Sequence, residues 1–149
     1  MQSSNTTNMA VSSSSVEALG KTSSCTLYVC TSCRTAGMPR YPEENRPGFI
    51  LYERVKKAIF DSPLKNQVDV KAAECLSICP RPCGIAIATP QANHWQYLFG
   101  DQDPDRGVDE IVECVSVYLQ SEAGFMARSA RPKSLRSSIL GRIPPLGSR

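Results

Sequence analysis

The sequence predicts an α/β fold with a mixed sheet of four strands and two main helices. Two stretches repeat apolar residues at helical spacing, and the segments between them include short runs typical of strands. Their order along the chain is strand, helix, strand, two-stranded hairpin and helix. A helical crossover places two strands parallel, whereas a hairpin adds antiparallel strands, so the sheet is expected to be mixed.

The first half of the predicted domain is a strand, a loop and a helix. Residues 26–29 (Thr-Leu-Tyr-Val) form a β-prone run, and a proline-rich loop follows it. From residue 48 to residue 61, apolar side chains recur at helical spacing. Pro47 stands near the first turn of this pattern and Ser62-Pro63 ends it. We therefore expect an amphipathic helix that crosses from the first strand to the second.

The second half contains three strands and the other helix. Residues 68–73 alternate apolar and polar side chains, which is typical of a strand. Residues 85–88 and 95–99 are β-prone runs separated by a polar turn, and this predicts a hairpin. Asp103-Pro104 is a typical helix start, and the apolar stripe behind it predicts a helix to about residue 120.

Both ends of the chain differ in composition from the domain, which we assign to residues 25–127. Residues 1–24 are rich in Ser, Thr and Asn and have no continuous apolar segment, so a disordered leader is predicted. Residues 128–149 contain six basic residues and no acidic one, which leaves 11 basic and 14 acidic residues before them. We expect this basic tail to be extended and to dock through its apolar residues 143–146.

The composition favours a cytoplasmic protein that does not use a membrane or a nucleic acid. No apolar run approaches the roughly 20 residues of a membrane span, and the N-terminus lacks the features of a secretory signal. The basic tail has no aromatic residue after Phe125 on which a base could stack, so a nucleic-acid partner is not expected. No phosphate loop, nucleophile elbow or pair of catalytic carboxylates is evident, and we therefore expect no enzyme activity.

Five of the seven cysteines lie in two clusters. Cys30 and Cys33 follow the first strand, whereas Cys75, Cys79 and Cys83 occur at a spacing of four before the third strand. In a reducing cytoplasm such clusters serve metal binding or redox chemistry more often than disulfides. Because the end of the first strand and the loop after the second lie at one edge of the predicted sheet, the two clusters should be close together.

Four thiolates are the ligand set of an iron–sulfur cluster and also of structural zinc. Zinc usually binds two Cys-x-x-Cys units, whereas the second cluster here is Cys-x-x-x-Cys, so the spacing favours iron and sulfur. The alternative is a zinc or other metal in a structural or carrier module, for which Cys83 would suit ligand exchange. A third interpretation is a thiol–disulfide oxidoreductase that uses Cys30 and Cys33. No helix follows Cys33 closely in the sequence to lower the pKa of such a thiol.

The other candidate residues have ordinary structural explanations. Cys25 and Cys114 are expected to be unreactive thiols of the fold. His94, the only histidine, occurs in a turn away from the cysteines and is not expected to bind a metal. Arg34 and Arg81 stand beside the cysteines in the sequence, where they could offset part of the charge of a cluster.

Several motifs resemble a known family. They are Val-Cys-Thr-Ser-Cys-Arg (29–34), Glu-Cys-Leu-Ser-Ile-Cys (74–79), Cys-Gly-Ile-Ala (83–86), Tyr-Leu-Phe-Gly-Asp-Gln-Asp-Pro (97–104) and Arg-Ile-Pro-Pro-Leu (142–146). Over residues 25–146 the chain is similar to a bacterial family of predicted metal-binding proteins of unknown function (domain of unknown function 1636). The second cysteine pair and the strand behind it also resemble thioredoxin-like 2Fe-2S ferredoxins, whose first pair is spaced more widely than Cys30 and Cys33.

The resemblance implies a thioredoxin-like fold and ferredoxin-like electron transfer through a 2Fe-2S cluster. The expected metal ligands are Cys30, Cys33, Cys75 and Cys79, with Cys83 as a further residue at the cofactor. The expected partner is a protein that exchanges electrons or metal with this one, and the chain is also compatible with a homodimer.

Overall fold

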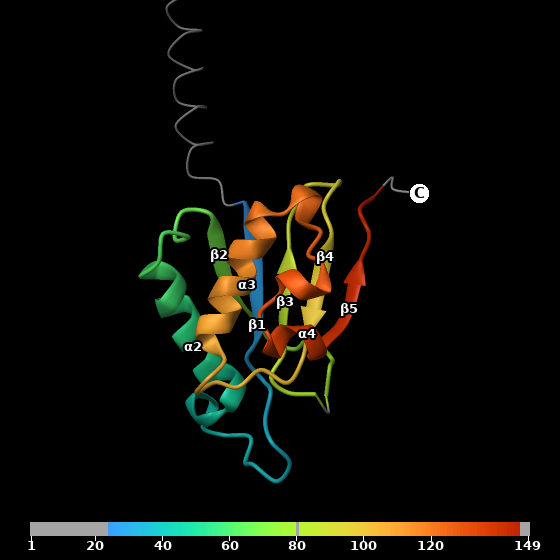
Figure 1. Cartoon of the computed structure of the whole chain (residues 1–149). Coiled ribbons are helices and arrows are strands. Elements are labelled where there is room, and N and C mark those ends of the chain that lie inside the picture. Colours follow the sequence, from blue (N-terminus) through green and yellow to red (C-terminus); the bar gives the residue numbers. More distant parts are fainter. Residues whose placement is uncertain (1–23, 80, 147–149) are drawn as a thin grey trace, which may run out of the picture.

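A computed structural model describes residues 24–79 and 81–146, so the predicted leader lies outside the described residues apart from Ser24 (Figure 1). Within the described part, five strands form one sheet in the order β2-β1-β3-β4-β5. The strands are β1 (Cys25–Cys30), β2 (Val68–Ala73), β3 (Ile85–Ala88), β4 (Gln96–Phe99) and β5 (Ile139–Ile143).

The predicted parallel pair and hairpin are confirmed. Strands β1 and β2 run parallel, with Cys25 opposite Val68 and Cys30 opposite Ala73. Strand β3 is antiparallel to β1, and β4 is antiparallel to β3. Helix α2 (Pro47–Phe60) makes the crossover from β1 to β2, close to the predicted bounds.

The prediction of four strands is wrong because the C-terminal segment adds a fifth. Strand β5 pairs antiparallel with β4 at the edge of the sheet. Its last three residues are all exposed, so it lacks the alternation that identifies a half-buried strand in a sequence. The Arg142 guanidinium of β5 lies 4.8 Å from the ring centroid of Trp95 and 5.2 Å from that of Phe125. These cation–π contacts hold the edge strand on the domain.

The predicted docking of the apolar residues 143–146 is wrong, because the side chains of Ile143 and Leu146 are exposed. The predicted extended tail is extended only over β5. Before it, the chain forms the short helices η3 (Arg128–Ala130) and α4 (Ser134–Ser137). The arginines here donate hydrogen bonds to backbone carbonyl groups: Arg128 to Arg136, Arg131 to Met126 and Leu135, and Arg136 to Ser129 and Arg131. These basic side chains therefore stabilise the turns that precede β5.

The second main helix begins later than predicted. Helix α3 spans Val108–Gln120, and Gly107 precedes it. The Asp103 carboxylate accepts hydrogen bonds from the N–H groups of Asp105 (2.8 Å) and Arg106 (3.2 Å). This cap, however, belongs to a separate turn, which closes where the Gly107 N–H donates to the Asp103 carbonyl oxygen (2.8 Å). The predicted start is wrong by one turn because an Asp-Pro pair favours an isolated turn as well as a helix.

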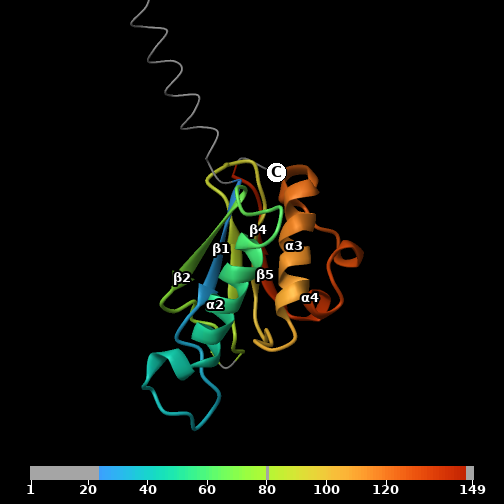
Figure 2. The same ribbon diagram turned by 90° about the vertical axis from the view of Figure 1, so that its left-hand side faces the viewer.

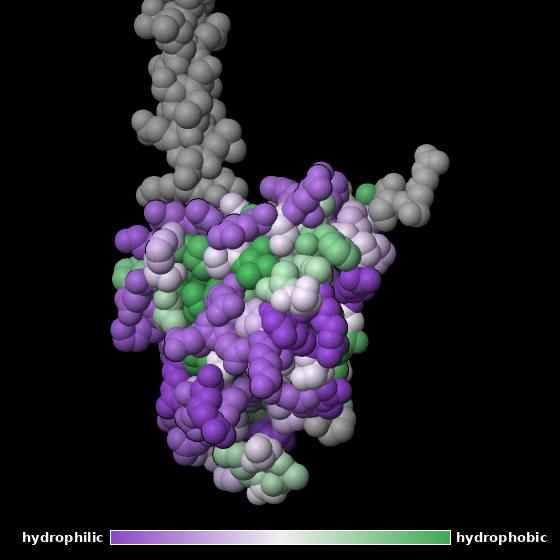
Figure 3. Space-filling view, viewed as in Figure 1, coloured by the Kyte–Doolittle hydropathy of each residue, from purple (hydrophilic) through white to green (hydrophobic). Residues whose placement is uncertain are grey.

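The helices cover one face of the sheet. In Figure 2, α2, α3 and α4 lie on the same side of the strands. The core fills the space between these layers and includes fully buried Leu27, Leu51, Ile85, Phe99 and Ile111. Figure 3 shows that the outer surface of the helical layer is largely hydrophilic, as expected of amphipathic helices. Among the described residues, no helix combines the length and the hydropathy that a membrane span needs.

Candidate metal centre

The two loops that carry the clustered cysteines meet at one end of the sheet. One loop follows β1, and the other connects β2 to β3 on either side of β1. The Thr31 N–H donates to the Ala73 carbonyl oxygen (2.8 Å), and the Cys30 N–H donates to the Gly84 carbonyl oxygen (2.9 Å). The end of β1 is therefore tied to both ends of the second loop, as the order of strands predicts.

The start of helix α2 also lies against the first cysteine pair. The Gly48 N–H donates to the Cys33 carbonyl oxygen (3.2 Å). A Cβ atom at Gly48 would lie 2.2 Å from the Cys30 carbonyl oxygen, so the approach requires glycine. The sequence distance between Cys33 and the helix suggested that no helix start would be near this pair. The loop of residues 34–46 folds back, however, and returns the chain to Cys33.

Three cysteines, which we call the inner cysteines, are buried together. Cys30, Cys33 and Cys83 have exposed fractions of 2%, 1% and 3%. Cys33 interacts with both Cys30 and Cys83, and these interactions shift the pKa values of all three thiols. Cys83 stands two positions before the buried Ile85, and residues two apart in a strand face the same side. That spacing was a signal in the sequence that Cys83 would face the core.

The hydrogen bonds between the inner cysteines set the order of their acidities. The bond with Cys33 raises the pKa of Cys30, and burial raises it further. The bond with Cys30 lowers the pKa of Cys33, but the bond with Cys83 and burial outweigh it and raise this pKa to about 11. The bond from Cys33 lowers the pKa of Cys83 below the usual value in spite of its burial. Cys83 is consequently the most acidic of the three thiols.

Backbone N–H groups are directed at the sulfur atoms. The backbone of Leu76 and of Ser32 acts to lower the pKa of Cys30, and the backbone of Gly84 acts to lower that of Cys33. The N–H of Ser77 lies 3.2 Å from the Cys75 Sγ atom. Such bonds stabilise thiolates and are one of the means by which a protein tunes an iron–sulfur cluster. The chemistry of the donor set therefore fits a metal bound by thiolates.

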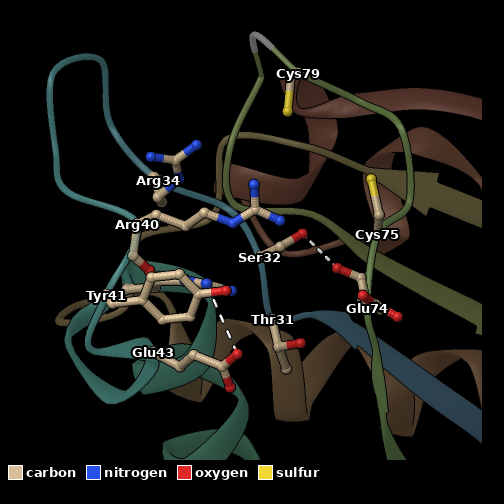
Figure 4. Close-up of a pocket in the computed structure, with 10 residues that line it drawn as sticks. Thr31, Ser32, Arg34, Arg40, Tyr41, Glu43, Glu74, Cys75 and Cys79 are labelled. Carbon is tan, nitrogen blue, oxygen red and sulfur yellow. Dashed lines mark hydrogen bonds and ion pairs between the residues drawn. The ribbon is translucent and has the colours of Figure 1, made fainter.

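Cys75 and Cys79, which we call the outer cysteines, are both exposed. They line one wall of an open pocket of about 780 Å³, and residues of the loop after β1 form the other wall (Figure 4). Within residues 24–79 and 81–146, no group of three or more His, Cys, Asp or Glu side chains is arranged to hold a metal ion. The structure thus buries the inner cysteines together and places the outer pair on the adjacent pocket wall.

The remaining residues singled out from the sequence have clear positions. Cys25 and Cys114 are buried, and Cys114 lies 3.9 Å from the sulfur of Met126. His94 lies in a turn, hydrogen-bonded to its neighbour Asn93 (2.9 Å). The guanidinium of Arg81 is paired with Asp101, whereas Arg34 lines the pocket of the outer cysteines. The other residues that line this pocket, among them Arg40 and Tyr41 in a loop without periodic pattern, were not singled out from the sequence.

Comparison with known proteins adds a family and a fold. Residues 27–145 match the model of a family described as "Protein of unknown function (DUF1636)". A comparison with curated proteins finds no match. A thioredoxin-like [2Fe-2S] ferredoxin from Aquifex aeolicus is similar in structure, with a TM-score of 0.53 and 19% sequence identity over 86% of this chain and 100% of the ferredoxin chain. The crystal structure of the wild-type thioredoxin-like [2Fe-2S] ferredoxin from this organism gives a TM-score of 0.49 and 12% identity, over 80% and 99% of the two chains. The likeness to the first structure confirms the predicted thioredoxin-like fold.

Proposed function

This chain belongs to the DUF1636 family of proteins of unknown function, and we propose that it binds a 2Fe-2S cluster through cysteine thiolates and transfers single electrons. The observation that carries the proposal is the meeting of two cysteine loops at one end of the sheet, with backbone N–H groups directed at the sulfur atoms. The likeness to a [2Fe-2S] ferredoxin supports it at the level of the fold.

A 2Fe-2S cluster takes four thiolates. The proposed ligands are the two cysteine pairs that the resemblance implies, Cys30 with Cys33 and Cys75 with Cys79. When bound, the cluster supplies one-electron redox chemistry. The N–H groups of Leu76, Ser32 and Gly84 would stabilise the thiolate forms of Cys30 and Cys33 and adjust the reduction potential. The exposed outer cysteines define the side from which a redox partner would approach.

Cys83 has a supporting role in this proposal. Like Cys30 and Cys33 it is buried and does not line the open pocket, and it is a fifth thiol beyond the four that a cluster takes. Cys83→Ser should therefore preserve cluster binding, whereas Cys79→Ser should remove it. The two variants form a matched pair, because each replaces one cysteine of the same loop by serine.

The proposal is tested by redox titration of the full chain purified without oxygen and followed by electron paramagnetic resonance. A reversible one-electron couple is expected in the wild type and in Cys83→Ser, with a paramagnetic signal on reduction. Cys79→Ser should lack the signal. Wild-type protein that contains the cluster but shows no reversible couple would count against electron transfer.

A second candidate function is that of a carrier module that hands a metal or a cluster to a partner protein. It is favoured by the difference in exposure between the inner and the outer cysteines. Exposed thiols can exchange a ligand with a partner more readily than buried ones. Metal transfer to an acceptor without redox cycling would favour this candidate. In either case we propose a role in binding and transfer rather than as an enzyme.

A further inference from the structure

We propose that the pocket beside the outer cysteines binds a small ligand through an oxyanion group, a carboxylate or a phosphate, held by Arg34 and Arg40. A volume of about 780 Å³ is typical of sites for small molecules. In Figure 4, Arg34 and Arg40 come from the loop after β1, and the outer cysteines form the facing wall. The inference goes beyond the metal centre, because neither arginine is a proposed metal ligand.

The backbone of Arg40 is held in place by a hydrogen bond from the side chain of Arg46. Arg46, which is only 9% exposed, donates from its Nε atom to the Arg40 carbonyl oxygen (2.8 Å). The guanidinium of Arg46 lies 3.8 Å from the carboxylate of Glu43, which offsets its charge. The backbone that carries Arg40 is thereby fixed, and the positive charge of Arg46 is balanced within the loop.

The aromatic ring of Tyr41 positions the side chain of Arg40. The guanidinium carbons of Arg40 and Arg46 lie 5.9 Å and 5.5 Å from the centroid of this ring. Figure 4 shows Arg40 extending past Tyr41 toward Ser32 and the outer cysteines. A guanidinium that is oriented before the ligand arrives loses less conformational freedom on binding.

Arg34 and Arg40 both lack a carboxylate partner within the described residues. Arg34 donates to the Met38 carbonyl oxygen (2.9 Å), a neutral group, and Arg40 forms no ion pair. In contrast, Arg54, Arg81 and Arg106 each pair with an aspartate. Two carboxylates also line the pocket: Glu43, which is paired with Arg46, and Glu74. The three arginines still leave one net positive charge, which favours an anion. The planar guanidinium groups of Arg34 and Arg40 match the geometry of carboxylate and phosphate oxygens.

The rest of the pocket indicates what else the ligand carries. The Tyr41 side chain is 63% exposed and offers a flat apolar surface next to Arg40. Thr31, Ser32, Glu43, Arg46, Glu74 and the outer cysteines line the remainder. The ligand therefore has an anionic end on the arginines and a less polar part between the tyrosine ring and the cysteines.

Isothermal titration calorimetry of the full chain, with its metal content measured, tests the proposal. The probes are succinate for carboxylates, inorganic phosphate for phosphates and glycerol as an uncharged control, none of which is a strong metal chelator. We expect saturable binding of at least one anion with one site per chain, and no binding of glycerol. The anion that binds more tightly identifies which of the two groups the pocket prefers.

Three variants of the same net charge locate the site. Arg34→Gln and Arg40→Gln should each weaken binding by about tenfold or more, since each removes charge-assisted hydrogen bonds. Lys57→Gln removes one charge near the far end of α2, where Lys57 pairs with Asp61, and should leave binding unchanged. If Arg40→Gln fails to fold, Arg40→Lys keeps the charge without the planar fork and should still weaken binding. Absence of saturable anion binding, or equal weakening in Lys57→Gln, would overturn the proposal.

Discussion

Gly48 lies so close to Cys30 that no side chain fits between them. A Cβ atom on Gly48 would be 2.2 Å from the Cys30 carbonyl oxygen and 3.1 Å from the Cys33 Cβ atom. Because Gly48 belongs to the first turn of α2, this contact sets the distance between the helix and the first cysteine pair. The geometry of the candidate metal centre therefore depends on a residue that touches no sulfur.

Replacing Gly48 should be destabilising, although glycine is normally unfavourable in a helix. Gly→Ala in a helix usually stabilises by about 1 kcal/mol, but an added methyl group in a packed site costs about 1–3 kcal/mol. Because the clash is with a backbone atom, we expect the cost to outweigh the gain, so that Gly48→Ala lowers the free energy of unfolding in urea by about 1–2 kcal/mol. Gly141→Ala is the control, because a Cβ atom there meets nothing within 4 Å. Gly48→Ala protein as stable as the wild type would contradict the close approach.

The exposure of the thiols predicts the order in which they react in metal-free protein. Cys75 and Cys79 should be alkylated first by iodoacetamide, because they are exposed. The inner cysteines should follow at least about tenfold more slowly, since their sulfur atoms are buried and hydrogen-bonded. Cys25 and Cys114 should react only after unfolding. Mass spectrometry of peptides at successive times measures this order, and labelling of Cys30 as fast as Cys75 would refute the division into two groups.

Alkaline pH should weaken the fold through its buried thiols. Burial raises the pKa of Cys114 from 9.0 to about 12. Burial, together with the smaller effect of the charge of Asp69, raises the pKa of Cys25 to about 12 as well. Both thiols stay protonated in the folded chain, and unfolding lets them ionise above pH 9. Their stabilising contribution is therefore complete below pH 9 and is lost as the pH rises toward 12.

The size of this effect can be measured on one thiol. Each buried thiol should lower the free energy of unfolding by about 1.4 kcal/mol for each pH unit in that range. Urea unfolding of the wild type and of Cys114→Ala at pH 8 and pH 10 gives the two pH dependences. The variant should lose less stability than the wild type between these pH values. Equal losses would show that Cys114 is not a buried protonated thiol.

The fifth strand should depend on its cation–π contacts. Arg142→Ala removes the guanidinium from the rings of Trp95 and Phe125, which should cost about 0.5–2 kcal/mol. Hydrogen exchange of residues 139–143 should accelerate in this variant. Lys133→Ala is a suitable control, since Lys133 is exposed in the same segment. If the two variants exchange equally over β5, the aromatic contacts do not hold the strand.

The elements that could be predicted from the sequence are those with a buried periodic face. Helix α2 buries Leu51, Val55 and Ile59 at helical spacing, and this pattern predicted its bounds. Strand β3 alternates buried and half-buried residues and was predicted with its correct ends. Strand β5 was missed because an edge strand can form by backbone pairing without burying a face.

The candidate site was predictable only in part, for a related reason. The spacing of the cysteines and the order of the strands indicated that the two loops would meet, and they do. The loop after β1 has no periodic pattern, so the positions of Arg40 and Tyr41 opposite the outer cysteines could not be derived. Their arrangement depends on the hydrogen bond between Arg46 and the Arg40 carbonyl oxygen, which is a tertiary contact of an irregular loop.

The metal and sulfide content of protein purified without oxygen tests the central claim most directly. The visible spectrum should be that of an iron–sulfur protein, with iron and acid-labile sulfide in equal amounts of about two per chain. Both should be kept in Cys83→Ser and lost in Cys75→Ser and in Cys79→Ser. Colourless protein that holds zinc in place of iron, or iron and sulfide that persist in both outer-cysteine variants, would contradict the proposed cluster.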